Sequence, residues 1–330
     1  MAQRQPLYSI SPFRSSSKNT DTQLDMCVSD KYSKIDLFTA DFASSPTLLA
    51  DYLRHVHRQD PEYIPDNMDE DGEFEDPLDE MHDWILQPFL PIFRQLAPLD
   101  QSREYTLKDC LFAEKFHYTV QVLEESLVPV CLNNSKGKKN HLIGARLPFS
   151  THVDYSMFPV YHPSEVQVPI DASSTSLPAV PHKVFIHGRP KPSFFNIVYA
   201  GDAGIILKEL LAYSRIHMAK FDATVRTSRL DGLVQDDNGH VMGLLLSYID
   251  CRGTTLRCID GRNPENSDSR QKWIDWGDAK AANVLIDVNG DAYLIDFGGG
   301  YTVGWVEKEM ANSIDGDLQG LENIRPYLFE

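Results

Sequence analysis

The sequence is short of basic side chains and of long hydrophobic runs. Its 330 residues carry 31 Lys and Arg against 48 Asp and Glu, a formal net charge of −17 at pH 7. A balance this acidic repels phosphate backbones and anionic lipid headgroups, and the one dense basic cluster is Lys136, Lys138 and Lys139. No window approaches the roughly 18–20 apolar residues of a membrane span. We therefore expect neither nucleic acid nor a membrane among the partners.

Paired cysteines are also missing. The five cysteines are widely spread, and none belongs to a C-x-x-C pair that could begin a zinc or redox site. The first residues lack the apolar core of roughly 7–15 residues that a secretory signal needs. We expect reduced, mostly buried thiols in an intracellular, cytoplasmic protein.

The composition, 42% hydrophobic and 24% charged, is ordinary for a globular protein, and the length is enough for two domains. Residues 1–30 are polar and are predicted to be a disordered tail. Residues 31–165 are predicted to form an α+β extension. Within it, ten of the eighteen residues from Asp66 to Asp83 are acidic, which indicates a solvated surface loop. A metal site is the alternative there, although the glycine turn and ligand spacing of a calcium loop are missing.

The spacing of apolar residues predicts the main elements. From Met81 to Leu96 they recur every three or four positions, which predicts one helix or two helical turns broken by proline. We expect the Trp84 to Leu96 face to pack on the region that follows residue 165. Partial alternation over 107–130 predicts strands. Further short strands are predicted at 166–168, 184–186, 194–199, 232–235 and 243–249, with a helix over 205–216.

The best-determined local pattern is a hairpin over 284–295. Two apolar segments flank Asn289-Gly290, and an Asn-Gly pair between apolar segments predicts a type I′ turn.

Polar residues stand at both ends of this hairpin. Trp276-Gly277-Asp278-Ala279-Lys280-Ala281-Ala282-Asn283 precedes it and Asp296-Phe297-Gly298 follows it. A two-stranded ribbon brings one amide and one carboxylate to the same end, where they can hold a divalent ion. A carboxylate that accepts a hydroxyl proton, a lysine that neutralises phosphate and an Asn/Asp pair that binds Mg²⁺ are the parts that phosphoryl transfer requires.

The run resembles the catalytic loop H-R-D-x-K-x-x-N and the D-F-G motif of the protein kinase superfamily. The lysine stands two residues and the asparagine five residues after Asp278, and Asp296 stands thirteen residues after Asn283. The wording W-G-D-A-K-x-x-N is similar to that of a fungal protein-kinase-like group. A purely structural acidic hairpin is the bland alternative.

The resemblance implies a role for each matching residue. Asp278 would be the catalytic base and Lys280 the phosphate-neutralising side chain. Asn283 and Asp296 would be the ligands of Mg²⁺. The remaining positions are assigned as follows: Glu209 would be the helix acid that pairs with a strand lysine, Tyr248, Ile249 and Asp250 the hinge that presents backbone groups to the adenine of ATP, and Asp317 the buried acid that braces the catalytic loop. Taken alone, Glu209 reads as a surface helix residue and Asp317 as a helix N-cap.

Three departures from the family pattern count against catalysis. Asn196 occupies the strand position where an ATP-anchoring lysine is expected, unless Lys191 or Lys208 substitutes for that lysine. No G-x-G-x-x-G loop precedes it, so phosphate cradling by backbone amides is not predicted. Only 27 residues separate Asp250 from Asp278, and they leave no room for the long amphipathic helix that a kinase C-lobe places there. We interpret 272–275 as the start of that helix joined directly to the catalytic loop, as an altered splice or a mistaken gene model would produce.

The sequence thus predicts an α+β protein with a kinase-like two-lobed fold, an N-lobe over 166–250 and a minimal C-lobe over 251–330. The predicted activity is ATP-dependent, Mg²⁺-using transfer of the γ-phosphate to a protein Ser/Thr or a small-molecule hydroxyl. The alternative is a pseudokinase, scaffold or truncated gene product without activity, and a non-kinase acidic adaptor is the third possibility.

Overall fold

The structure is a computed structural model that describes residues 7–11, 14–15, 20–59, 76–135, 143–147, 155–222, 224–256 and 276–325. The basic cluster at Lys136, most of the acidic segment, Cys258 and the interval 257–275, which includes the predicted helix junction, lie outside the described residues. The chain divides into two units. Unit 1 comprises residues 1–139 and 170–181, and unit 2 comprises residues 140–169 and 182–330.

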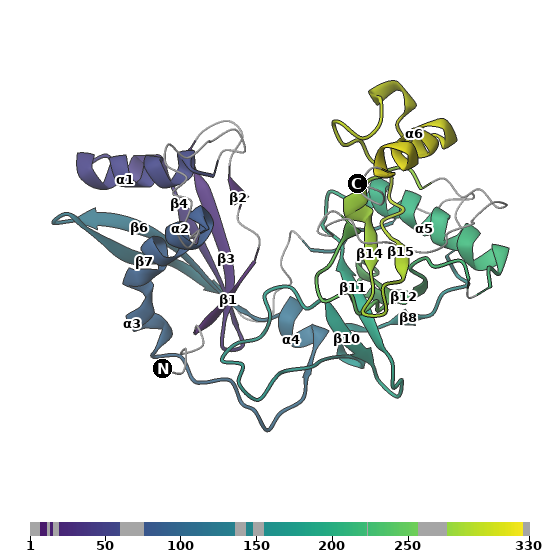
Figure 1. Cartoon of the computed structure of the whole chain (residues 1–330). Coiled ribbons are helices and arrows are strands. Elements are labelled where there is room, and N and C mark those ends of the chain that lie inside the picture. The colour runs from purple at the N-terminus through teal and green to yellow at the C-terminus, as the bar shows by residue number, and fades with distance from the viewer. Residues whose placement is uncertain are drawn as a thin grey trace. The chain divides into compact units, whose positions relative to one another are not determined.

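Unit 1 is built on a sheet with strand order β1–β3–β4–β6–β7 (Figure 1). The strands are β1 (Tyr8–Ile10), β3 (Thr22–Val28), β4 (Lys31–Leu37), β6 (Glu114–Leu123) and β7 (Ser126–Ser135), and β2 (Arg14–Ser15) pairs with β3. The β4–β6 pair is parallel, whereas β3–β4 and β6–β7 are antiparallel. Alternate residues of β3 and β4 are apolar and completely buried, as a sheet with one covered face requires; they are Leu24, Met26, Ile35 and Leu37.

Helices cover that apolar face. They are α1 (Pro46–His57), α2 (Pro77–Leu86) and α3 (Leu90–Phe93), while α4 (Leu107–Leu111) follows the short strand β5 (Tyr105–Thr106). Ser45 and Asp76 cap α1 and α2 with their side-chain oxygens, and a proline begins each helix. The proline-broken helical turns predicted from Met81 onward are confirmed as α2, a 3₁₀ turn over Gln87–Phe89, and α3.

Two predictions for this part of the chain are wrong. β1 and β3 lie within the predicted disordered tail, because the alternation of Leu24, Met26 and Val28 gives β3 a buried face that the polar composition of the segment concealed. The face from Trp84 to Leu96 packs on unit 1's own sheet, in one core with those strands. The polar composition that conceals β3 also conceals the sheet on which this face packs.

A distant segment completes unit 1. Residues 170–181 return to it after the chain has entered unit 2. The amide of Leu177, whose side chain is completely buried, donates to the carbonyl of Ser29 (2.7 Å), and the amide of Ala179 donates to Ser9 Oγ (3.1 Å). Unit 1 is therefore assembled from two separated stretches of sequence.

Unit 2 combines a mainly antiparallel sheet with one long helix. The strands run in the order β9 (Val166–Val168), β10 (Lys183–Ile186), β11 (Pro192–Ile197), β13 (Val241–Ser247), β12 (Leu230–Gln235) and β8 (Val160–Tyr161). Helix α5 (Ala203–Ala219) buries Ile206, Leu210, Tyr213 and Ile216 in one core with Val198, Leu233 and Leu244. The predicted short strands and the helix over 205–216 are confirmed, with bounds shifted by a few residues.

The predicted hairpin is confirmed as β14 (Val284–Ile286) and β15 (Ala292–Leu294), but its turn differs from the prediction. The amide of Gly290 donates to the Asp287 carbonyl (3.0 Å), and Gly290 has φ +85° whereas Asn289 keeps a negative φ. A type I′ turn needs positive φ at both central residues. Here the Asp287 carboxylate accepts from the amides of Asn289 and Asp291 (both 2.9 Å), and this side-chain bonding favours the longer turn with one left-handed glycine.

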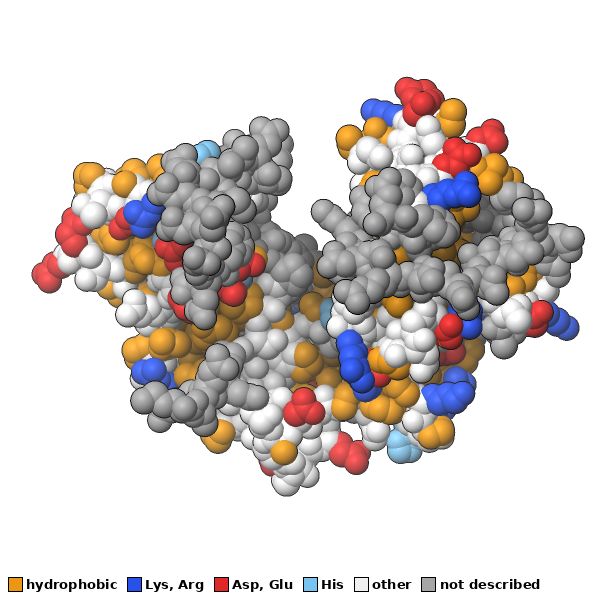
Figure 2. All heavy atoms as spheres, viewed as in Figure 1, with side chains coloured by type: hydrophobic (Ala, Val, Ile, Leu, Met, Phe, Trp, Pro, Cys, Tyr) orange, Lys and Arg blue, Asp and Glu red, His pale blue; other side chains and the backbone are white. Residues whose placement is uncertain are grey.

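The molecule is thus mixed α and β with several sheets. Among the described helices none has the length and apolar character needed to cross a bilayer. On the face drawn in Figure 2, basic side chains are scattered among acidic ones and do not form one continuous patch.

Candidate functional site

The hairpin of unit 2 brings Asn283 and Asp296 to one end of a two-stranded ribbon. Val284 pairs with Leu294, and the amide of Ile295 donates to the carbonyl of Asn283 (3.0 Å). Asn283 and Asp296 therefore lie at the same end of the ribbon, as the sequence predicts. We call the group Asp278, Lys280, Asn283, Asp296 and Thr302 the hairpin corner.

Asp278 is the centre of the corner and is bonded on both carboxylate oxygens. Lys280 Nζ donates to Oδ2 (2.5 Å) and Thr302 Oγ1 donates to Oδ1 (3.2 Å). Asn283 Nδ2 donates to the Asp278 carbonyl (2.9 Å) and lies 3.4 Å from Oδ2. Since Asp278 is only 8% exposed, these bonds hold its carboxylate in one orientation. Thr302, which also accepts from Lys280 (3.1 Å), was not predicted, because no pattern marks it in an irregular loop.

Helix α6 (Ile314–Ile324) braces the loop that carries Asp278. The Asp317 carboxylate is buried and accepts from the amides of Trp276 (2.6 Å) and Gly277 (2.7 Å). The helix N-cap is Ser313 instead, so the N-cap alternative for Asp317 is wrong. Trp276 is held again through its indole nitrogen, which donates to the Ile295 carbonyl (2.7 Å), and this bond links the loop to the far strand of the hairpin.

The segment from Asp296 to Gly300 runs closely past helix α5. Asp296 is exposed and adopts φ +60°, a conformation that non-glycine residues seldom adopt. Phe297 is buried edge-on against Tyr213, with ring centroids 5.6 Å apart. A Cβ on Gly298 would stand 3.1 Å from Ile205 Cγ2 and 4.0 Å from Glu209 Cβ. The Asp296 carboxylate therefore lies beside the helix residue Glu209.

Glu209 and Asn196 meet at the other end of the site. Glu209 is 3% exposed, so it is not the surface residue that the bland interpretation assumed. The pKa of Glu209 is raised to about 7: burial is the largest cause, the nearby Asp296 carboxylate contributes to the increase, and a side-chain hydrogen bond from Asn196 opposes it. β11 thus pairs the helix acid with a neutral amide where the family pattern places a lysine.

The chemistry of the corner fits a magnesium ion. Although Asp296 as a residue is exposed, partial desolvation of its carboxylate raises its pKa above the ordinary value; a Gly298 amide bond and Lys280 oppose this, and the Asp278 carboxylate adds to it. Two carboxylates that repel each other, with an Asn amide beside them, supply the oxygen ligands that Mg²⁺ prefers. Among the described residues no group of three or more His, Cys, Asp or Glu side chains forms a metal site by itself. One or two protein ligands suffice for Mg²⁺ when phosphates and waters complete its coordination.

The expected hinge lies at the end of β13. Lys183 Nζ stands 5.0 Å from the centre of the Tyr248 ring, the Cys251 amide donates to the Ile249 carbonyl (3.0 Å), and the Val288 amide donates to the Asp250 carbonyl (2.9 Å). β13 pairs with β11, where Leu244 stands opposite Asn196. The structure thus brings the hairpin corner together and joins Asn196 to Glu209, and it ties the Tyr248–Asp250 segment to the turn of the hairpin.

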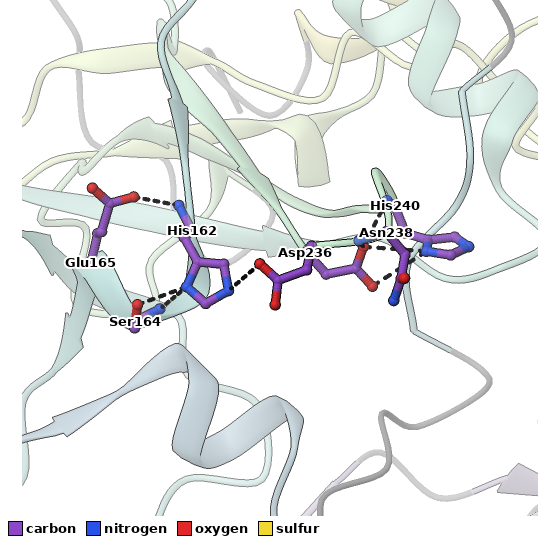
Figure 3. Close-up of polar contacts among 7 residues, drawn as sticks. His162, Ser164, Glu165, Asp236, Asn238 and His240 are labelled. Atoms are coloured by element: carbon purple, nitrogen blue, oxygen red, sulfur yellow. Dashed lines mark hydrogen bonds and ion pairs between the residues drawn. The ribbon is translucent and has the colours of Figure 1, made fainter.

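A second polar cluster, at the turn between β12 and β13, was not predicted (Figure 3). Asp236 accepts from the amides of Asn238 (2.9 Å) and His240 (2.8 Å) and from the His240 ring (3.2 Å). Burial alone would raise the pKa of Asp236, but these bonds together lower it. His162 Nε2 lies 3.5 Å from the exposed Asp237 carboxylate. The Asp236 carboxylate is occupied by the turn itself, and an Asp-x-Asn-Gly pattern could have revealed it.

In comparisons with known proteins, no family model matches the chain and no curated protein matches it.

Proposed function

We propose that this protein is an ATP-dependent, Mg²⁺-using phosphotransferase with a protein-kinase-like two-lobed fold, and that it transfers the γ-phosphate to a protein Ser/Thr or a small-molecule hydroxyl. In this proposal the β9–β13 sheet and α5 form the small lobe, and the hairpin with α6 forms a minimal second lobe. The fold and the activity are inferred together from unit 2.

One observation carries the proposal. The corner joins a carboxylate, a lysine and an asparagine in mutual contact, with Lys280 2.5 Å and Asn283 Nδ2 3.4 Å from Asp278 Oδ2. Asp296 leaves the same end of the ribbon, where the charges of Asp278 and Lys280 act on its carboxylate. A structural acidic hairpin would not need a lysine and two carboxylates at one end, whereas phosphoryl transfer uses each of them.

The roles follow from the positions. Asp278 would orient the attacking hydroxyl and accept its proton, because its carboxylate is held in place by Thr302 and Lys280. Lys280 would leave Asp278 in part to neutralise charge on the transferred phosphoryl group. Asn283 and Asp296 would hold Mg²⁺, which supplies charge neutralisation to the phosphates. Asp317 would act as a positioning residue through the Trp276 and Gly277 amides.

The contact between Asn196 and Glu209 supports a second candidate, a pseudokinase that binds a partner without turnover. A strand lysine at this position would both pair with the buried acid and contact phosphate. A neutral asparagine does only the first, through its hydrogen bond to Glu209.

Calorimetric titration of the full chain with ATP, with and without Mg²⁺, tests the proposal. Asp296→Ala removes a proposed metal ligand, and Asp291→Ala is the matched control, since it removes an aspartate at the turn end of the same hairpin. Saturable binding that needs Mg²⁺, survives in D291A and disappears in D296A supports a nucleotide site, and transfer of labelled γ-phosphate to a hydroxyl substrate then identifies the enzyme. Absence of binding by the folded chain overturns the phosphotransferase proposal.

A further inference from the structure

Helix α5 presents a short stripe to the glycine segment that follows Asp296. A Cβ on Gly298 would stand 3.1 Å from Ile205 Cγ2 and 4.0 Å from Glu209 Cβ, and a Cβ on Gly299 would stand 3.9 Å from Lys208 Cδ. Positions 208 and 209 each lie about one helix turn after position 205, so both neighbour it on the helix surface. The Lys208 stem thus runs along the backbone of this glycine segment.

That segment in turn touches the catalytic loop of the proposed function. A Cβ on Gly277 would stand 2.9 Å from the Gly299 Cα, and a Cβ on Gly300 would stand 3.4 Å from Asp278 Oδ2. Glycine is required for this approach at Gly277 and Gly299, because a Cβ on Gly277 would collide with Gly299 Cα and a Cβ on Gly299 would collide with Asn312 Oδ1. Gly299 is thus in contact with the Lys208 stem and close to Gly277 of the loop that carries Asp278.

The charges around the corner call for another cation. Asp278, Asp296 and Glu209 are three acids, and the lysine of the corner, Lys280, is already bonded to Asp278. A nucleoside triphosphate would bring further negative charge, which charge-assisted bonds from lysine stabilise. The strand that could supply an ammonium group carries the neutral Asn196.

Lys208 is available for this role and Lys191 is not. Lys208 is exposed and forms no ion pair among the described residues. Lys191 precedes the start of β11, where its charge acts with that of Arg189 on the Asp231 carboxylate. Asn196 lies towards the other end of that strand.

We infer that Lys208 binds the phosphates of the nucleotide, supplying from helix α5 the charge that Asn196 leaves absent on β11. This rests on the proposed nucleotide site and names the residue that holds its phosphate end. It also accounts for a lysine placed directly before the buried Glu209, since the two neighbours then serve opposite purposes: one packs inside and the other reaches the ligand.

The test compares Mg²⁺·ATP and adenosine as ligands of the full chain. Lys208→Met keeps the apolar stem along Gly299 and removes the charge, and Lys191→Met is the matched control. We expect K208M to weaken Mg²⁺·ATP binding by about 10- to 100-fold, the range for a bond to a charged group. We expect K208M to leave adenosine binding unchanged, and K191M to bind both ligands as the wild type does.

A charge-shifting variant adds a sharper readout. In the K208M background, Asn196→Lys should recover much of the lost affinity for Mg²⁺·ATP, because the ammonium group would then come from β11 beside Glu209. Equal losses for ATP and adenosine in K208M, or unchanged ATP binding, would overturn the role of Lys208 while leaving the nucleotide site intact. A wild-type chain that binds neither ligand would overturn the proposed function itself.

Discussion

The hairpin corner of unit 2 and the core of unit 1 differ in how several of their buried polar groups are bonded. In unit 2, the buried Asp278, Asn283 and Asp317 are hydrogen-bonded to neighbours within the same small region. In unit 1, Asp25 Oδ1, Ser33 Oγ and His55 Nδ1 are buried without a hydrogen-bond partner. Thr227 Oγ1, outside the hairpin corner, is an exception in unit 2. Polar groups that are held by several partners keep a fixed geometry, as the proposed chemistry of the hairpin corner would require.

The largest effect is expected at Asp278, the centre of the hairpin corner. Asp278→Asn keeps the size of the side chain but removes the proposed base, so we expect phosphoryl transfer to fall by about 10²- to 10⁴-fold while Mg²⁺·ATP binding persists. The measurement is incorporation of labelled γ-phosphate under saturating ATP, with Asp291→Asn as the control. Transfer that is unchanged in D278N would show that Asp278 is one more buried acid and not a base.

Removal of the Asp317 carboxylate should destabilise the loop that carries Asp278. Asp317→Ala leaves the amides of Trp276 and Gly277 without their charged acceptor, and we expect a loss of about 2–4 kcal/mol in local stability. Native-state hydrogen exchange of these two amides measures the loss. Asp315→Ala, at an exposed position on the same helix, should leave the exchange unchanged. Exchange in D317A as slow as in the wild type would mean that the loop does not depend on helix α6.

Replacement of the buried Asp25 in unit 1 should raise stability, whereas replacement of Asp317 in unit 2 should lower it. Asp25 is 2% exposed and holds one bond, from Gln23 Nε2 (2.9 Å), while its other oxygen has none. Asp25→Val removes an acceptor whose burial without a partner costs about 1–3 kcal/mol and loses a bond of about 1 kcal/mol. We therefore expect a gain of about 1 kcal/mol in the exchange stability of β3 and β4. A loss in D25V would show that the carboxylate stabilises unit 1.

The smallest effect is a pH dependence of unit 1. Burial lowers the pKa of His55 and of His82 below the ordinary 6.5, although nearby carboxylates oppose it. As the pH falls below 6.5, the unfolded chain takes up protons that the folded unit does not, so the free energy of unfolding decreases until the pH reaches the folded pKa. We expect the free energy of unfolding of unit 1, measured by native-state hydrogen exchange, to be larger at pH 7 than at pH 5.5, and to depend less on pH in the double variant His55→Gln, His82→Gln. His57→Gln, on the exposed side of α1, should keep the wild-type profile.

Much of unit 2 could be predicted because its information is local. The hairpin, the strands and helix α5 are predicted by apolar periodicity. The hairpin corner is predicted because the start of the first strand of a hairpin lies beside the end of its second strand. Asn196 and Glu209 were identified as a pair from their positions in the motif, and they are hydrogen-bonded. Thr302 was missed, since it reaches Asp278 from a loop whose course depends on the close approach of Gly277 and Gly299.

Unit 1 could be predicted less well because its sheet is assembled over long sequence distances. β4 pairs in parallel with β6, which lies far along the chain, and such pairings leave no local trace in the sequence. The polar residues of β3 hid a strand whose alternate positions are buried. Because the sequence conceals this strand, it also conceals the sheet on which the Trp84 to Leu96 face packs.

The return of residues 170–181 to unit 1 has a consequence for how the protein is made. A ribosome synthesises the chain from its N-terminus, so unit 1 cannot close around Leu177 until that residue has been made. By then β8 and β9 of unit 2 have already been synthesised, and β10 to β13 have not. Unit 1 is therefore completed by a segment that is synthesised nearly half of the chain after Val28. A fragment ending at Lys139 would lack Leu177 and Ala179, and would expose Ser29 and Ser9 to water where the full chain bonds them.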